Sequence, residues 1–275
     1  AELDTHLRRL TGVDPLPGDG AVVISRSVLH PDLRRAERYV LDELAGTPGI
    51  TVQTHCIDAV VELDGGPALA EGVCTIAAEL PGLDPDRAPL ILGAHLDSTA
   101  KASIPWDPYV DPAPGADDDA SGVSAILVLA KALAARGGFA RTVRFVLFTA
   151  EEVGLQGSSA YVDALAESGE DVALMLQLDP VGYNGAGADR LWFAYDGRWP
   201  ELPGFVDDAA EELGSWLSVQ GVSEALIGGD DRSDHYPFWQ AGMPALHFGA
   251  FPPPPDYHKT TDTMDGVDQA FLAEV

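Results

Sequence analysis

Hydrophobic residues in the middle of the chain form short runs that stop at acidic residues or histidine. Three such runs are residues 90–94 before His95 and Asp97, 143–150 before Glu151 and Glu152, and 172–178 before Asp179. Runs of this length that do not alternate with polar residues predict strands buried on both faces of a sheet. Because side chains of metal-ligand type follow each run, we expect one polar centre at one edge of that sheet.

Helical and strand patterns around these runs predict the rest of the fold. Apolar spacing predicts helices at 31–45, 122–135, 157–166 and 203–213, and β-formers predict strands at 51–63, 72–80, 191–195, 216–219 and 244–248. The strands 51–63 and 72–80 flank a Gly-Gly turn and are expected to form a hairpin. The succession of strands and helices predicts an α/β fold. We expect a single domain, residues 1–275, with three αβα layers around a mixed, mostly parallel sheet.

The charge of the chain narrows the choice of partners. Lys and Arg number 16 against 44 Asp and Glu, which gives a formal net charge of −28. Such a charge repels phosphate backbones and anionic lipids, so we expect neither a nucleic-acid nor a membrane function. No apolar run reaches the length of roughly 18 residues that a membrane span needs. The acidity is typical of a well-solvated surface, and composition alone does not distinguish this from adaptation to high salt.

Two cysteines and the first residue bear on localisation. Cys56 and Cys74 lie at similar distances on either side of the Gly-Gly turn, so a disulfide across the hairpin is one interpretation. The other interpretation is two small hydrophobic side chains within the sheet. Because the chain begins at Ala1 rather than Met, we expect a secreted or periplasmic protein whose leader has been removed.

The polar residues at the strand ends are of the types that bind a divalent metal. They are His95, Asp97, Asp117, Glu151, Glu152, Asp179 and, after a run of four prolines, His258. Imidazole and carboxylate ligands without thiolate suit zinc at a site left open for chemistry. Five such ligands and a spare carboxylate fit two ions roughly 3.5 to 4 Å apart, with one carboxylate bridging them.

Neighbouring residues in this set can have different tasks. Side chains alternate along a strand end, so one glutamate of the pair Glu151 and Glu152 can bind metal while the other carries a proton. Asp97 can accept the second N–H of the His95 imidazole and fix its tautomer. Elsewhere, His235 and His247 are alternative ligands, although a capping or core role is the simpler interpretation of both.

Six segments, taken in order, carry a resemblance to a known family. They are GAHLDS at 93–98, PGADDDASG at 114–122, AEEVGL at 150–155, QLD at 177–179, RSDH at 232–235, and YH at 257–258 with DT at 262–263. This order resembles the two-zinc aminopeptidases of metallopeptidase family 28, most closely the secreted bacterial leucyl enzymes. The resemblance covers residues 90 to 263 and implies the zinc-peptidase (phosphorylase/hydrolase-like) fold.

The resemblance also implies a role for each site residue. Asp117 would bridge two Zn²⁺ ions, His95 and Asp179 would hold one, and Glu152 and His258 the other. Glu151 would be the general acid/base, Tyr257 would stabilise the oxyanion, and Arg232 would contact substrate. A cis peptide is expected after the bridging residue, at Asp117–Asp118.

These inferences together predict a monomeric aminopeptidase that removes an apolar, leucine-like residue from peptides with a free N-terminus. Phe248, Phe251 and Met243 are candidates for the side-chain pocket, and Pro180 replaces the larger apolar residue that relatives often place there. Three alternatives remain. They are a single-zinc glutaminyl cyclase, a two-metal carboxypeptidase or deacylase, and a non-enzymatic binding module. The short segment between Asp179 and His258 disfavours the second, and the complete ligand set disfavours the third.

Overall fold

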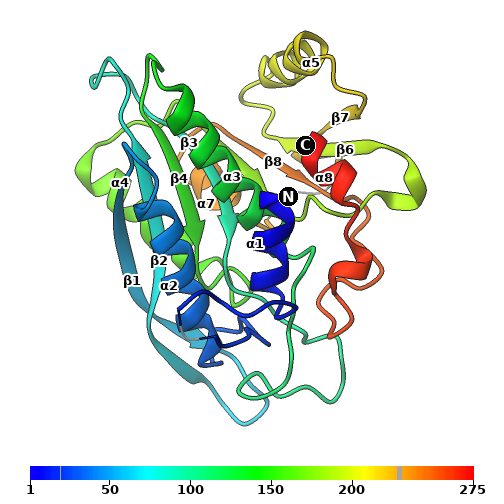
Figure 1. The fold of residues 1–275 in the computed structure, drawn as a ribbon. Coiled ribbons are helices and arrows are strands. Elements are labelled where there is room, and N and C mark those ends of the chain that lie inside the picture. Colours follow the sequence, from blue (N-terminus) through cyan, green and yellow to red (C-terminus); the bar gives the residue numbers. More distant parts are fainter. Residues whose placement is uncertain (19, 228–230) are drawn as a thin grey trace.

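The computed structural model describes residues 1–18, 20–227 and 231–275. Within them one mixed sheet of eight strands runs in the order β1-β2-β4-β3-β5-β8-β6-β7 (Figure 1). The strands are β1 Thr51–Val61, β2 Ala68–Leu80, β3 Leu90–His95, β4 Val143–Phe148, β5 Leu174–Leu178, β6 Arg190–Tyr195, β7 Ser218–Ser223 and β8 Ala245–Gly249. The predicted α/β fold with a mixed central sheet is confirmed.

The centre of the sheet is parallel, and this parallel core positions the site. β4 pairs with β3, β3 with β5, and β5 with β8, all in the same direction. The antiparallel hairpin of β1 and β2 flanks this core on one side, and β6 with β7 flanks it on the other. In the ladder His95 lies opposite Phe148, and Leu178 lies opposite Phe248. The carboxyl ends of the four central strands therefore share one edge.

Helices cover both faces of the sheet. One face carries α1 Glu2–Leu10, α2 Asp32–Ala45, α3 Ala120–Arg136 and α8 Gln269–Glu274, and the opposite face carries α4 Gln156–Ser168 and α7 His235–Gln240. α5 Leu202–Leu213 and the short α6 Glu224–Ile227 pack beside β7. The 3-10 turns Gly185–Gly187 and Met264–Gly266 complete the helical elements of the described chain. Of the helices described, none has the length and apolar character required to span a membrane.

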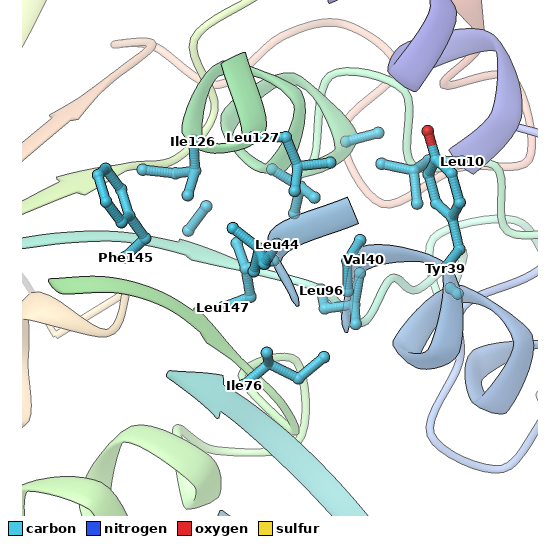
Figure 2. Packing of buried hydrophobic residues seen from close by; sticks show 14 of the residues in the cluster. Leu10, Tyr39, Val40, Leu44, Ile76, Leu96, Ile126, Leu127, Phe145 and Leu147 are labelled. Carbon is cyan, nitrogen blue, oxygen red and sulfur yellow. The ribbon is translucent and has the colours of Figure 1, made fainter. Parts of the chain in front are cut away.

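The alternation of side chains along β4 explains why its sequence is apolar throughout. Phe145 and Leu147 pack under α2 and α3, as Figure 2 shows, whereas Val146 and Phe148 pack against α4 and α7. A strand buried on both faces needs an apolar residue at every position. By contrast, a strand was predicted at 216–219, whereas β7 lies at Ser218–Ser223. This strand is half-exposed and lacks a continuous apolar run that would mark its ends.

The hairpin resolves the alternative that the sequence leaves open for the two cysteines. Cys56 and Cys74 face each other in the β1–β2 register and form a disulfide, with their Cα atoms 4.0 Å apart. β1 is an edge strand of the sheet, so the bond ties the edge to its neighbour.

A buried histidine joins α1 to α2. The Nδ1 atom of His6 lies 2.5 Å from the hydroxyl of Tyr39, which also accepts a hydrogen bond from Arg9. Burial lowers the pKa of His6 to about 4, and the positive charges of Arg9 and Lys131 add to this effect while Glu2 opposes it. Because folding favours the neutral ring, the tyrosine O–H can donate to it.

This histidine predicts a pH-dependent stability. The unfolded His6 takes up a proton below pH 6.5 and the folded one only below about 4, so stability is lost as pH falls through this window. The loss corresponds to about 3 kcal/mol. Denaturant unfolding at pH 7.5 and 4.5 should therefore show a steeper decline for the wild type than for His6→Gln. Parallel declines would contradict the prediction; the acidic side chains common to both proteins cancel in the comparison.

Candidate metal centre

Two histidines and three carboxylates meet at the carboxyl edge of the sheet. The Nε2 atom of His95 lies 3.0 Å from Asp118 Oδ1 and 3.3 Å from Asp179 Oδ1. The Nε2 atom of His258 lies 3.2 Å from Asp118 Oδ2 and 3.1 Å from Glu152 Oε2. Asp118 therefore lies between two groups of three ligand atoms, with one carboxylate oxygen directed to each histidine.

The strand ends bring these residues together. His95 is the last residue of β3, Asp179 follows β5, and Glu152 lies beyond the turn at Ala150 that follows β4. His258 comes from the loop after β8, and its backbone has a positive φ of 57°. Four of the five ligand-type residues at the centre, those other than Asp118, were predicted from the sequence.

The fifth prediction needs a correction. Asp117, expected to lie between the two ions, does not contact either histidine; Asp118 occupies that place. The cis peptide expected at Asp117–Asp118 is likewise one residue further along, at Asp118–Asp119.

The three adjacent aspartates point to three different partners, and this explains the error. Asp117 Oδ1 accepts a hydrogen bond of 2.7 Å from the backbone N–H of Gly182. Asp119 accepts one of 3.0 Å from the N–H of His95 and caps α3 by accepting another from Gly122. These donors come largely from segments distant in sequence, so the Asp-Asp-Asp run contains no signal for which carboxylate faces the histidines.

A buried carboxylate and a buried guanidinium hold the loop that carries Asp118. Asp262 accepts hydrogen bonds from the backbone N–H groups of Asp117 at 2.9 Å and Asp118 at 3.1 Å. The fully buried Arg26 donates to four main-chain carbonyls at 2.7 to 2.9 Å, those of Leu10, Leu96, Pro114 and Gly115. Arg26 is not recognisable from the sequence, because no pattern around it indicates burial.

Asp97 contacts the site differently from the prediction. The Nδ1 atom of His95 lies 3.0 Å from the main-chain oxygen of Asp97 and 3.9 Å from its carboxylate. The carboxylate instead accepts hydrogen bonds from the N–H groups of Glu151 at 3.1 Å and Glu152 at 3.2 Å. Asp97 thus fixes the His95 ring through its backbone and orients the glutamate pair through its side chain.

Glu151 offers a carboxylate beside the ligand groups. One of its oxygens lies within 4.8 Å of ligand atoms of both His95 and Glu152. Burial raises the pKa of Glu151 well above its ordinary value; the charge of His95 opposes this, and those of Glu152 and Asp179 add to it. A carboxyl group with a raised pKa can both accept and return a proton near neutral pH.

The charges around the two histidines favour cations. Burial alone would lower the pKa of His258, but the carboxylates of Asp118 and Glu152 raise it to about 9. Burial would also lower the pKa of His95. The charges of Asp179 and Glu151, together with hydrogen bonding to Asp118, instead raise it well above its ordinary value. Both rings therefore lie in a strongly negative potential.

The ligand set fits zinc. Zn–N and Zn–O bonds of about 2.1 Å in a tetrahedron separate the ligand atoms by roughly 3.4 Å, close to the 3.0 to 3.3 Å found here. Among the described residues, no hydrogen-bond donor reaches the buried Glu152 Oε1, and the neighbour of Asp118 Oδ2 at 3.2 Å is His258 Nε2, itself an atom of ligand type. Since buried carboxylate oxygens are normally paired, these two atoms are available to a metal ion.

A small apolar pocket lies on one side of the ligand groups. Arg232 and Tyr257 line a cavity that also reaches Asp179, Pro180 and Pro253. The guanidinium of Arg232 stacks on Phe251 at 5.8 Å. Arg232, His247 and Ala250 connect this cavity to a second one of about 30 Å³, whose lining includes Trp192, Phe193, Val222 and Phe251.

The remaining predicted residues fall into two groups. Tyr257 stacks on His258, with ring centroids 3.7 Å apart, and Phe251 lines the second cavity. Phe248 and Met243 pack against core clusters and do not line either cavity. His247 lies 2.6 Å from the main-chain oxygen of Asp179 and stacks on His235, so both histidines have structural positions outside the ligand groups.

Comparison with known proteins places this geometry in context. A family model described as Peptidase family M28 matches residues 75–275. Leucine aminopeptidase 1 of Trichoderma harzianum is 34% identical over 222 residues, 77% of this chain and 52% of that protein. The chain matches between 28 and 52% of the length of such curated relatives.

Two solved structures share the fold over almost the whole chain. The LapA aminopeptidase of Legionella pneumophila has a TM-score of 0.75 at 20% identity, covering 99% of this chain and 68% of that one. The glutaminyl cyclase of Bacteroides thetaiotaomicron has a TM-score of 0.74 at 18% identity, covering 100% and 93%. Identities this low establish the fold alone.

The two neighbouring aspartates provide a matched test of the metal centre. Asp118→Asn removes the charge between the two histidines and should lower the zinc retained after dialysis by at least about half. Asp117→Asn keeps an oxygen for the N–H of Gly182 and should retain the wild-type zinc content. Elemental analysis of the dialysed proteins measures both. Equal loss in the two variants, or loss only in Asp117→Asn, would contradict the assignment.

Proposed function

Since the chain belongs to peptidase family M28, we propose that it is a zinc-dependent aminopeptidase that releases the N-terminal residue from peptides. The observation that carries the proposal is Asp118, whose two oxygens each face a separate histidine and carboxylate. This arrangement suits two metal ions that share one bridging ligand.

The proposed ligands divide into two sets. His95 and Asp179 would hold one Zn²⁺, Glu152 and His258 the other, and Asp118 would bind both. When bound, zinc supplies Lewis acidity towards the scissile carbonyl and lowers the pKa of coordinated water. Asp97 would keep two of these ligands in position. Its main-chain oxygen contacts the His95 ring, and its carboxylate accepts a hydrogen bond from the backbone N–H of Glu152.

Glu151 is the proposed proton carrier. It takes a proton from the attacking water and returns it to the leaving amine, for which its raised pKa is suited. The N–H of Glu151 donates to Asp97, so its backbone is fixed by the carboxylate that also fixes Glu152. Tyr257 lies next to His258 and lines the cavity at Asp179, where its hydroxyl can donate to the oxyanion.

Charge and shape support a preference for apolar N-terminal residues. Carboxylates dominate the site, and a free ammonium group is stabilised in that potential. The adjoining pocket presents Trp192, Phe193, Val222 and Phe251 to the first side chain. A leucine-like residue is the proposed occupant, with Arg232 at the junction of the two cavities.

Glutaminyl cyclisation is the second candidate function, because the fold also matches a cyclase over nearly its full length. The two groups that share Asp118 each offer three ligand-type residues, which supports two ions rather than one. Zinc content near one per chain, with turnover of N-terminal glutamine, would favour the cyclase function over the aminopeptidase function.

Other parts of the chain bear on where it acts. Disulfides persist mainly in oxidising compartments, so the Cys56–Cys74 bond supports a secreted or periplasmic location.

Leucyl p-nitroanilide and its N-acetyl derivative test the reaction class. We expect the zinc-loaded protein to cleave the first and not the second, because acetylation removes the ammonium group that the carboxylates recognise. Release of nitroaniline measures both rates. Comparable cleavage of the two compounds would refute the aminopeptidase assignment.

Glu151→Gln tests the division of roles between the two glutamates. It keeps the size of the side chain but cannot carry a proton, so kcat should fall by about 10²- to 10⁴-fold while zinc content is retained. Glu152→Gln is the matched control and should lower zinc content as well as activity. If both variants lose zinc equally, the assignment of Glu151 as proton carrier is wrong.

A further inference from the structure

A large cleft adjoins the ligand groups on the side of Glu152. Its volume is about 630 Å³, and its lining comes from the β1–β2 turn, the loop after β3, the turn after β4 and the segment before α2. The first two of these segments project beyond the same end of the sheet (Figure 1). Arg232, Tyr257 and Phe251 do not line it, so it is separate from the two connected small cavities described above.

The cleft has apolar walls and a single basic side chain. Val28, Val61, Leu63, Trp106 and Val153 contribute apolar surface. Lys101 is the one lysine or arginine among the described residues of the lining, whereas Glu62 and Asp64 come from the β1–β2 turn.

Lys101 lies at the boundary between the cleft and the ligand groups. Its Nζ atom is 3.4 Å from Glu152 Oε2, and its side chain is 54% exposed whereas that of Glu152 is only 4% exposed. Its backbone is held in place next to the site, because the N–H of Ala102 donates to the carbonyl of His258 at 2.9 Å and the neighbouring Ala100 is fully buried.

Resting on the proposed aminopeptidase function, we propose that this cleft binds the leaving side of the substrate and that Lys101 binds the free carboxylate of a dipeptide. In a dipeptide a single carbon separates the scissile nitrogen from the carboxylate carbon, so the carboxylate lies close to the scissile bond. The ammonium group of Lys101 lies 3.4 Å from Glu152 Oε2, beside the ligand groups at which the scissile bond would bind.

Longer peptides meet a different charge. Each further residue moves the terminal carboxylate outwards by up to about 3.5 Å, away from Lys101 and along a cleft that contains Glu62 and Asp64. Like charges repel, so the cleft selects for a carboxylate at the first leaving residue and against one further out. Dipeptides with an apolar second residue are therefore the substrate class assigned to this site.

Comparison of acid and amide substrates tests the assignment. For each protein the measured quantity is the ratio of kcat/KM for Leu-Ala to kcat/KM for Leu-Ala amide, so that a general effect on Glu152 or the metal cancels. Lys101→Met should lower this ratio by about two- to fivefold, within the range found for partly exposed ion pairs. Lys101→Arg should restore most of it.

Two controls make the result specific. Lys131→Met removes a lysine that pairs with Glu2 on α1 and should keep the wild-type ratio. The acid-to-amide ratio for Leu-Ala-Ala-Ala should be insensitive to Lys101. An unchanged dipeptide ratio in Lys101→Met, with leucyl p-nitroanilide still cleaved, would overturn the role of the cleft alone. Absence of anilide cleavage in the wild type would overturn the proposed function and this inference with it.

Discussion

Repulsion among buried carboxylates is the constraint on which the rest of the site depends. Asp97, Asp117, Asp118, Asp119 and Asp179 are all buried at one edge of the sheet, with Glu151 and Glu152 beside them. Burial by itself disfavours each charge, and every neighbour adds to the cost. A fold that gathers these carboxylates must therefore supply hydrogen-bond donors for most of them, and a bound cation must neutralise the others.

The chain meets this requirement mainly with backbone N–H groups. Asp97 receives two from the turn after β4, Asp119 receives those of His95 and Gly122, and Asp262 receives two from the loop that carries Asp118. Arg26 adds a fixed positive charge beneath this loop while its donors satisfy four main-chain carbonyls. The loops that connect the strands are thus folded around the carboxylates. Among the described residues, Asp117 Oδ2, Asp118 Oδ2 and Glu152 Oε1 are buried carboxylate oxygens of this group that lack a hydrogen bond.

This division explains how far sequence reasoning could reach. The runs before His95, Glu151 and Asp179 are apolar because the central strands are buried on both faces, so the strand ends and the residues there were predictable. The choice among Asp117, Asp118 and Asp119 was not, because it is made by Gly182, His95 and Asp262 through the tertiary fold. For the same reason the sequence predicted a contact between Asp97 and His95 but not that the main-chain oxygen of Asp97 makes it. It also predicted Phe248 and Met243 as pocket residues, whereas both side chains pack against core clusters.

The two sides of the metal centre differ because different constraints act on them. The parallel strands fix the ligands, and a ligand cannot move without exposing or unpairing a buried charge. The flanking segments line the two cavities: β6, β7 and the residues directly after β8 shape an apolar pocket, and the β1–β2 turn and the loop after β3 shape an acidic cleft with one lysine. Lys101 and Tyr257 are lining residues that contact the ligand-type residues Glu152 and His258. Trp106 and Trp192 lie in the linings outside the ligand groups, so such positions can change without disturbing the ligands. Under the proposed function, substrate preference would therefore be set at the flanks of the sheet, and the reaction at its centre.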